Sequence, residues 1–375
     1  MDVQTLLLFI AGFFLLVGGA ELLVRGAARL AVAIGISPLV VGLTVVAYGT
    51  SAPELAVAIR AMYATPPRPD LAIGNVVGSN ISNVLLVLGI AALARPLIVQ
   101  RQLVRSNVPF MIIVSAVVWI MSLDGEISRP EGFVLFAGAV IYSVLAVVRS
   151  RQAVAVERAL DPEAPPVEKA TVGHLALQFA AIIAGLIMLV LGAQWLVEGA
   201  TVVAKLLQVS ELVIGLTVVA IGTSLPEVAT SLVAGIRGHG DIAVGNVVGS
   251  NIFNLLLVLG FAALIAPIPV QVKTAALRFD IPIMTAVALA CWPIFYTNWR
   301  IARWEGALFL AYYVAYAVFL FLKATDHDSL QQYDTAMKYF ILPITALVLV
   351  VLAVKFRYHE STSSTPTNED SQDAS

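Results

Sequence analysis

Residues 42–54 read GLTVVAYGTSAPE, and residues 215–227 repeat this stretch as GLTVVAIGTSLPE. The two copies differ at only two of thirteen positions. Each copy lies in an apolar segment long enough to cross a bilayer, and each ends in a glutamate, Glu54 or Glu227. A carboxylate inside a membrane segment is energetically costly, so it marks a candidate functional site. The duplication therefore predicts one site with two carboxylates.

The composition indicates a polytopic membrane protein. Of the 375 residues, 59% are hydrophobic and 12% are charged, whereas soluble domains contain about 25% charged residues. The formal net charge of -2 argues against a nucleic-acid partner. The first apolar run follows no basic segment and is longer than a signal peptide, so we interpret it as a retained membrane helix.

The hydropathy pattern predicts eleven membrane helices in two halves separated by a polar linker. We expect the first half at residues 1–149, the linker at residues 150–172 and the second half at residues 173–323. An extra helix within residues 324–357 and a disordered polar tail at residues 358–375 complete the chain. The expected helices are residues 3–33, 38–63, 71–94, 108–123, 132–148, 175–207, 212–236, 242–266, 277–296, 301–322 and 337–356.

A second duplicated stretch supports two homologous halves. Residues 70–89, DLAIGNVVGSNISNVLLVLG, match residues 241–260, DIAVGNVVGSNIFNLLLVLG, at sixteen of twenty positions. Because each half has an odd number of helices, the halves must enter the membrane from opposite sides. The predicted fold is therefore all-α and polytopic: two inverted five-helix repeats plus one extra C-terminal transmembrane helix. Such repeats are typical of secondary transporters that bind their substrates near the membrane midplane.

The distribution of basic residues predicts the orientation in the membrane. Thirteen Lys and Arg residues fall on the side of the linker and eight on the other side. Since basic residues are enriched on the cytoplasmic side, we expect the linker and the C-terminus in the cytoplasm and the N-terminus outside.

The repeated stretch contains the elements of a broken membrane helix. Pro53 has no N–H group and pushes against the carbonyl of Gly49, so we expect freed carbonyls near Ala47 and Tyr48. The alternative is a simple proline kink whose glutamate only bonds a neighbouring helix. Side-chain oxygens come from Thr50, Ser51 and Glu54, and the second copy repeats them in Thr223, Ser224 and Glu227.

The second motif adds hydroxyl and amide groups. Ser79 and Asn83 are four residues apart on one helical face, and Ser250 and Asn254 repeat this spacing. Interhelical hydrogen bonding is the competing explanation for any one asparagine. The combined groups are hard oxygen ligands, which suit calcium or sodium. All four histidines fall in loops or the tail, so a zinc, copper or nickel carrier is not expected.

The paired GTSxPE and GNVVGSN motifs resemble the α-repeats of the calcium:cation antiporters, and especially the prokaryotic sodium/calcium exchangers of the YrbG-like group. The resemblance covers residues 1 to about 323. It implies a central calcium site formed by Thr50, Glu54, Thr223 and Glu227. It also implies flanking sodium sites formed by Ala47, Ser51, Ser79, Asn83, Ala220, Ser224, Ser250 and Asn254. The first and sixth helices are expected to slide across the core to alternate access.

Two features depart from that family pattern. Well-studied exchangers often have an aspartate in one of the positions held here by Asn83 and Asn254, so this chain has less negative charge there. The helix expected at residues 337–356 is additional to the usual ten. The missing charge leaves open whether the counter-ion is sodium or a proton.

The predicted function is a secondary antiporter in the plasma (inner) membrane of a prokaryote, which exchanges calcium for sodium by alternating access. The ions are transported substrates, and no cofactor is expected. The alternatives are a calcium/proton antiporter, in which Glu54 and Glu227 take up protons, and a cation channel. An enzyme is not expected, because the serines beside the kinks have no His or Lys partner in a helix. The sequence leaves the oligomeric state open.

Overall fold

A computed structural model describes residues 3–160, 171–215, 218, 220–296, 299–325, 327, 329–331, 335 and 350. Apart from residue 350, the helix expected at residues 337–356 lies outside the described residues. The expected tail and residues 161–170 of the expected linker also lie outside them.

Within the described part, the fold is all-α and contains nine helices that are long and apolar enough to cross a membrane. Their positions confirm nine of the predicted helices, with ends shifted by a few residues in most cases. The nine are Val3–Ile34, Pro38–Met62, Pro69–Ala94, Leu103–Asp124, Arg129–Val156, Val172–Leu206, Gly240–Ile265, Ala276–Tyr296 and Arg303–Ala324. The segment expected as residues 212–236 is described as three shorter pieces, α10 (Glu211–Ile214), α11 (Ala220–Thr223) and α12 (Leu225–Ile236).

Several of these membrane segments are composite helices in which a π-helical turn (η) joins α-helical pieces. The segments of the first half comprise α2 (Pro38–Val41), η1 (Gly42–Val46), α3 (Ala47–Thr50), α4 (Ala52–Met62), α5 (Pro69–Ser82), η2 (Asn83–Leu88), α6 (Gly89–Ala94), η3 (Leu103–Asn107), α7 (Val108–Met121) and the 3-10 turn η4 (Ser122–Asp124). Those of the second half comprise α13 (Gly240–Phe253), η6 (Asn254–Leu259), α14 (Gly260–Ile265), η7 (Ala276–Asp280) and α15 (Ile281–Tyr296). The last described span, α16 (Arg303–Ala324), is a single uninterrupted helix.

The expected start of the linker was wrong. Helix α8 (Arg129–Leu160) continues through residues 150–160, which belong to the predicted linker. This segment, SRQAVAVERAL, is charged but rich in good helix formers, and the next proline is Pro162. Charge alone does not end a helix, whereas a proline restricts the residue before it.

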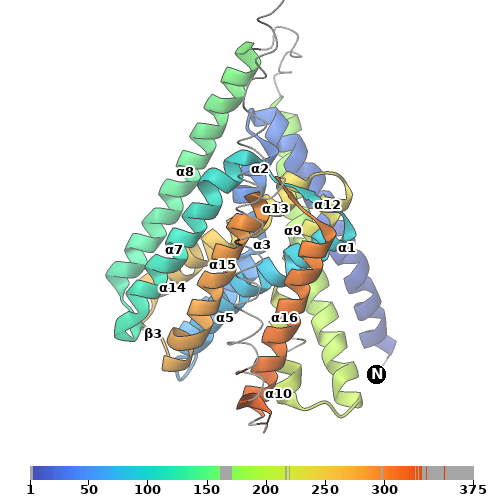
Figure 1. Cartoon of the computed structure of the whole chain (residues 1–375). Helices are drawn as coiled ribbons and strands as arrows, with labels where there is room; N and C mark the ends of the chain where they lie inside the picture. Colours follow the sequence, from blue (N-terminus) through green and yellow to red (C-terminus); the bar gives the residue numbers. More distant parts are fainter. Residues whose placement is uncertain are drawn as a thin grey trace, which may run out of the picture.

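Helices α1 (Val3–Ile34) and α9 (Val172–Leu206) pack against each other on one side of the molecule, opposite α8 (Figure 1). They run antiparallel, because Gly12 lies against Gly192 and Gly19 lies against Gly185. A Cβ atom on Gly19 would lie 2.8 Å from the carbonyl oxygen of Gly185. The glycines therefore allow the closest approach of the two backbones. These are the first helices of the two sequence halves.

Further contacts connect the two halves at the ends of the helices. Strand β1 (Leu97–Ile98) pairs antiparallel with β4 (Arg300–Ile301), and β2 (Glu126–Ile127) pairs antiparallel with β3 (Val270–Gln271). Each two-stranded sheet thus combines one strand from each half. The two membrane spans that contain α5 and α13 form the centre of the molecule. In their most apolar stretches, 83% and 78% of the residues are buried.

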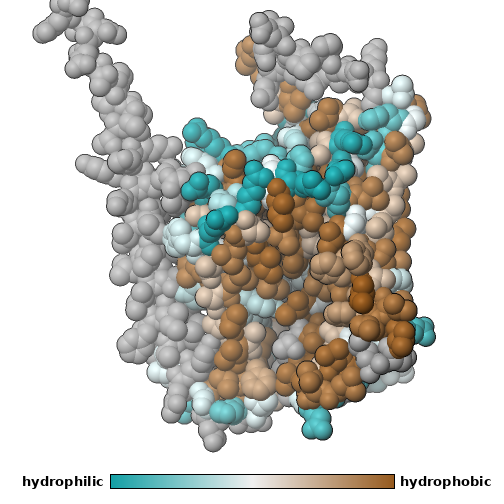
Figure 2. All heavy atoms as spheres, turned by 90° about the vertical axis from the view of Figure 1, so that its right-hand side faces the viewer, coloured by the Kyte–Doolittle hydropathy of each residue, from teal (hydrophilic) through white to brown (hydrophobic). Residues whose placement is uncertain are grey.

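The exposed surface fits a membrane-embedded protein. Figure 2 shows hydrophobic residues over the middle of one face, bordered by hydrophilic residues along the upper edge and at places along the lower edge. Large apolar side chains are exposed along the outer helices, including Phe13 and Phe14 of α1, Ile141 of α8 and Ile183 of α9. Such exposure is expected where lipid replaces water around a protein.

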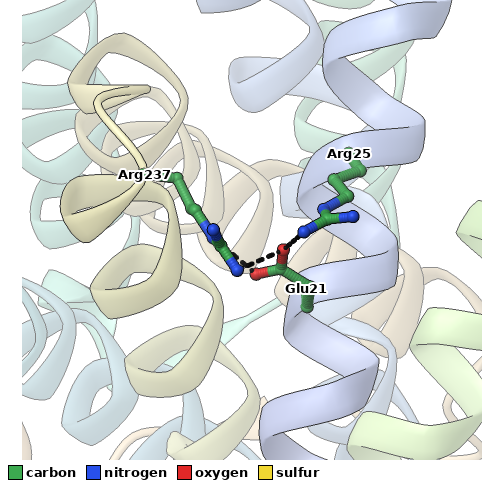
Figure 3. A network of polar contacts seen from close by, with 3 residues as sticks. All are labelled: Glu21, Arg25 and Arg237. Carbon is green, nitrogen blue, oxygen red and sulfur yellow. Dashed lines mark hydrogen bonds and ion pairs between the residues drawn. The ribbon is translucent and has the colours of Figure 1, made fainter.

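One ionic cluster connects α1 to the end of α12 (Figure 3). Glu21 of α1 pairs with Arg25 one turn later and with Arg237, the residue that follows α12. Arg237 contacts both carboxylate oxygens of Glu21, at 2.7 and 3.0 Å. The cluster ties the outer helix α1 to a helix that carries one of the two predicted glutamates.

Candidate cation-binding site

Both copies of the repeated stretch form broken helices, as the sequence predicted. Helix α3 ends before Ser51, whose backbone angles are φ -82° and ψ 3°, and α4 begins at Ala52. Ser224 has nearly the same angles, φ -90° and ψ 2°, between α11 and α12. A proline occupies the first turn of α4 and of α12, where its missing N–H group has no cost. Each break thus starts a new helix just before the glutamate.

Glu54 and Glu227 both lie in the first turn of these new helices. The N-terminus of a helix carries a partial positive charge, which stabilises a nearby carboxylate. Their side chains are buried, with relative exposures of 1% and 0%. The helix of each glutamate contacts the π-helical turn of the other half, α4 with η6 and α12 with η2. Two buried carboxylates therefore share one region between the helices.

The predicted release of the Ala47 carbonyl was wrong in one respect. This oxygen accepts a hydrogen bond from the backbone N–H of Ser51 at 3.0 Å. The break lies at Ser51, whose N–H still reaches back, and Pro53 instead removes the donor opposite the Gly49 carbonyl. The Thr50 hydroxyl also contacts this oxygen, at 3.4 Å, but it can donate to Asn246 instead, which leaves the second lone pair of the Ala47 carbonyl for a cation.

Each broken helix contacts helices of both halves. Helix α3 contacts α13 of the second half, whereas α4 contacts α5 of its own half. In the second copy, α11 contacts α5 and α12 contacts α13. The site is therefore built from both halves, and neither half could form it alone.

The hydroxyl of Thr50 shows this contact between the halves directly. Its Oγ1 donates to Asn246 Oδ1 at 3.2 Å and lies 3.3 Å from Ser250 Oγ. Both partners belong to α13. The contact brings together a predicted calcium ligand of the first motif and a predicted sodium ligand of the second motif from the opposite half.

The carboxylate of Glu54 is held within its own half. Ser79 Oγ donates to Glu54 Oε1 at 3.3 Å, and Asn75 Nδ2 donates to the Glu54 backbone carbonyl at 3.2 Å. Both donors lie on α5. The second oxygen, Oε2, has no hydrogen-bond partner. One face of the carboxylate is thus fixed, while the other is available for a cation.

Buried oxygens without a hydrogen-bond partner gather at the predicted residues. A buried polar atom normally has a partner, so such a concentration requires an explanation. Glu227 has none for either oxygen. The unpartnered side-chain oxygens among the predicted residues are Ser51 Oγ, Glu54 Oε2, Asn83 Oδ1, Ser224 Oγ, Glu227 Oε1, Glu227 Oε2 and Asn254 Oδ1.

Asn83 and Asn254 occupy matching positions, each at the first residue of a π-helical turn, η2 or η6. Such turns are frequent at functional sites. Their hydrogen bonding differs. Asn254 Nδ2 donates to Asn80 Oδ1 at 3.0 Å, whereas neither polar atom of the Asn83 side chain has a partner.

Asn80 and Asn251 join the two halves through reciprocal hydrogen bonds. Asn80 Nδ2 donates to the Asn251 carbonyl at 3.1 Å, and Asn251 Nδ2 donates to the Asn80 carbonyl at 3.3 Å. These bonds hold α5 against α13, and the bond from Asn254 shows that Asn80 also restrains a site residue.

Thr223 and Ala220 belong to α11, whose contacts lie with α5 and α9. The Thr223 side chain is partly buried. Most of the other predicted residues lie on α3, α4, α5, α12 and α13 or at the ends of these helices, among which α3 and α12 contact α13 and α4 contacts α5. In the described part of the chain, no three His, Cys, Asp or Glu side chains cluster, so the site consists of two carboxylates among neutral oxygens.

Two buried hydroxyl residues were not singled out from the sequence. Thr230 and Ser231 follow Glu227 by three and four residues, a spacing that places them on its face of α12. Both have a relative exposure of 0%. The matching residues of the first half are Val57 and Ala58. This replacement of two apolar residues by two hydroxyl residues is the sequence signal that could have identified Thr230 and Ser231.

Comparison with known proteins identifies the family. The family described as "Sodium/calcium exchanger protein" matches residues 4–148 and 177–322. The chain belongs to the sodium/calcium exchanger family. The exchanger is 39% identical over 290 residues to the inner membrane protein YrbG of Escherichia coli, a match that covers 76% of this chain and 88% of that protein.

Two further similarities extend over most of the exchanger. It is 34% identical over 352 residues to the sodium/calcium exchanger MaX1 of Methanosarcina acetivorans, covering 86% of this chain and 99% of that protein. It also resembles the solved structure of the sodium-calcium exchanger NCX_Mj soaked with 10 mM Na+ and zero Ca2+. That match has a TM-score of 0.71 and 31% identity, and covers 84% of this chain and 98% of the other. The exchanger is therefore an integral membrane protein of a transporter family.

Proposed function

We propose that this exchanger moves calcium out of the cell in return for sodium. The observation that carries the proposal is the set of buried, unpartnered oxygens around two carboxylates, Glu54 and Glu227. Burying two charged groups without compensation is unfavourable, and one divalent cation would neutralise both. Calcium prefers six to eight oxygen ligands of this kind in a flexible arrangement.

The resemblance assigns calcium to the centre and sodium to the flanks. Calcium would be bound by Thr50, Glu54, Thr223 and Glu227. Sodium ions would be bound by Ala47, Ser51, Ser79, Asn83, Ala220, Ser224, Ser250 and Asn254. Because the sodium ligands flank the calcium ligands around the same two carboxylates, calcium and sodium would compete for this region.

Alternating access requires a part that moves. Helices α1 and α9 form a pair at the side of the molecule, and their contact is lined by glycines. The glycines let α1 and α9 pack closely as one unit, which suits movement of the pair together over the core. The predicted inverted arrangement of the two halves would make the inward-facing and outward-facing states structurally equivalent.

Two observations support sodium as the counter-ion. The neutral hydroxyl and amide groups beside the carboxylates suit a monovalent metal cation, since they carry no proton to exchange at neutral pH. In addition, MaX1 and NCX_Mj are both named sodium/calcium exchangers. The second candidate is calcium/proton exchange, which is favoured by the absence of a negative charge at Asn83 and Asn254.

The deciding experiment is radioactive calcium uptake into proteoliposomes. Vesicles loaded with sodium are diluted into sodium-free buffer, and parallel vesicles receive a pH gradient of equal driving force. We expect uptake with the sodium gradient and none in Glu54→Gln. Uptake that responds only to the pH gradient would instead establish calcium/proton exchange, and a flux that needs neither gradient would indicate a channel.

We also propose the orientation predicted by the basic residues, with the N-terminus outside and the linker in the cytoplasm. The similarity to an inner membrane protein supports a location in the plasma membrane of a prokaryote. Cysteine labelling of Ser128→Cys and Gln152→Cys variants by a membrane-impermeant reagent tests it, because Gln152 is an exposed residue on the linker side of α8. Only the cysteine at position 128 should react from outside the cell.

A further inference from the structure

Four polar groups are connected by hydrogen bonds that lead from the site into the second half. Thr50 Oγ1 donates to Asn246 Oδ1 at 3.2 Å, and Asn246 Nδ2 donates to Ser231 Oγ at 3.1 Å. Ser231 Oγ in turn donates to the backbone carbonyl of Ala243 at 3.4 Å. The three side chains are buried, with relative exposures of 1%, 0% and 0%.

The carbonyl of Ala243, the last of the four groups, determines which group donates in each of these hydrogen bonds. The Ala243 carbonyl can only accept, so the single hydroxyl proton of Ser231 is directed toward it. Ser231 then offers a lone pair, and the Asn246 amide presents Nδ2 to it. The opposite end of that amide, Oδ1, consequently faces Thr50.

The orientation of the amide matters for Thr50. With Oδ1 facing it, Thr50 can donate its proton to Asn246 at 3.2 Å rather than to the Ala47 carbonyl at 3.4 Å, and no amide N–H group occupies its oxygen lone pairs. If the amide were turned by 180°, Nδ2 would donate to Thr50 and occupy a lone pair. A cation is bound by the lone pairs of a hydroxyl oxygen, so only the first arrangement prepares Thr50 as a ligand.

The arrangement belongs to one half only. The residue that matches Ser231 in the first half is Ala58, which has no hydroxyl group. Asn75, which matches Asn246, donates its Nδ2 to the backbone carbonyl of Glu54 instead. The two inverted halves therefore position their asparagines in different ways.

We propose that Ser231 is a positioning residue for calcium binding: through Asn246, it holds the Thr50 hydroxyl with its lone pairs toward the ion. This inference rests on the proposed function, because it takes Thr50 as a calcium ligand. Ser231 itself does not touch the ion. Its contribution is the prior orientation of a ligand, which improves affinity by lowering the ordering cost of binding.

The first test measures calcium affinity in Ser231→Ala, with Ser115→Ala as the matched control. Ser115 is also buried, at 1% exposure, but its hydroxyl bonds only the carbonyl of Met111 within α7. We expect the calcium dissociation constant of Ser231→Ala to rise about three- to tenfold, the effect of one lost hydrogen bond. The maximal exchange rate at saturating calcium should stay near that of the native protein. An unchanged dissociation constant in Ser231→Ala would overturn the proposal.

The second test is a double-mutant cycle with Thr50→Val. If Ser231 acts through the Thr50 hydroxyl, then Ser231→Ala should not weaken calcium binding further once that hydroxyl is removed. Equal losses in both backgrounds would show that Ser231 acts through general stability. If Ser231→Ala does not fold, Ser231→Cys replaces it, because a thiol is a weaker donor and acceptor of similar size. The cysteine variant should then give an intermediate affinity, and full native affinity would count against the proposal.

These outcomes are separable from failure of the proposed function. If the native protein binds no calcium, the proposed function fails before Ser231 is tested. If the native protein binds calcium and Thr50→Val weakens binding while Ser231→Ala does not, then only the positioning role is lost.

Discussion

Arg237 holds Glu21 through two contacts, Nε to Oε2 at 3.0 Å and a terminal nitrogen to Oε1 at 2.7 Å. The pair connects α1, a helix of the proposed moving pair, to α12, which carries Glu227. It has no equivalent in the other half, because Gln194 occupies the position that matches Glu21. The exchanger thus has an ionic contact that favours one position of α1 over the core.

Breaking this contact should loosen α1. The side chain of Arg237 is 52% exposed and that of Glu21 is 24% exposed, so the pair contributes only about 0.2–1 kcal/mol. In Arg237→Gln, we expect faster hydrogen–deuterium exchange in α1, and we expect the difference to shrink at high salt. Lys273→Gln is the control, because it breaks the Asp70–Lys273 pair, which does not involve α1. Equal hydrogen–deuterium exchange in α1 of both variants would show that the contact between Glu21 and Arg237 does not restrain α1.

Calcium should stabilise the folded exchanger only while both carboxylates are present. A ligand at about 100 times its dissociation constant adds about 2.7 kcal/mol of stability, which appears as a rise in the melting temperature. Glu54→Gln and Glu227→Gln should each abolish this rise. Glu126→Gln, an exposed substitution in β2, should preserve it. A persistent calcium-dependent rise in either site variant would remove that carboxylate from the calcium site.

The two asparagines should differ when changed to aspartate. Neither polar atom of Asn83 has a partner, so Asn83→Asp adds a charge without losing a hydrogen bond. Asn254→Asp instead places a carboxylate against Asn80 Oδ1, which now accepts from Asn254 Nδ2 at 3.0 Å. We expect Asn83→Asp to strengthen sodium inhibition of calcium binding.

We expect Asn254→Asp to strengthen sodium inhibition as well, but with a loss of stability of about 1–3 kcal/mol from the unsatisfied acceptor. Competition binding and chemical denaturation of both variants measure the two effects. If sodium inhibition is unchanged in both, the missing charge does not limit sodium binding.

The contact between α1 and α9 should not tolerate a side chain at its glycines. In Gly19→Ala, the new Cβ would lie 2.8 Å from the Gly185 carbonyl oxygen, so the backbones must separate. We expect a slower maximal exchange rate with little change in calcium affinity, because the site lies on other helices. Gly74→Ala is the control, since nothing lies within 4 Å of a Cβ added there. Equal rates in the two variants would show that this contact does not govern transport.

Much of the fold follows from local features of the sequence. Apolar length predicted the membrane helices, and the proline after each Gly-Thr-Ser run predicted both helix breaks. The error at residues 150–160 has a local cause as well. Polar composition suggested a linker, but the helix propensity of these residues extends α8 through Leu160.

The sequence by itself determined the chemistry of the site: two carboxylates, placed by a duplication within apolar segments and surrounded by hydroxyl and amide groups. It could not show which residues meet. Thr50 bonds Asn246, 196 residues away, and Ser231 fixes the orientation of that asparagine. Such contacts depend on how α3 packs against α13, and spacing along one helix carries no information about a helix from the other half. Only the tertiary structure could therefore decide that the two halves complete one site, and that they position their asparagines differently.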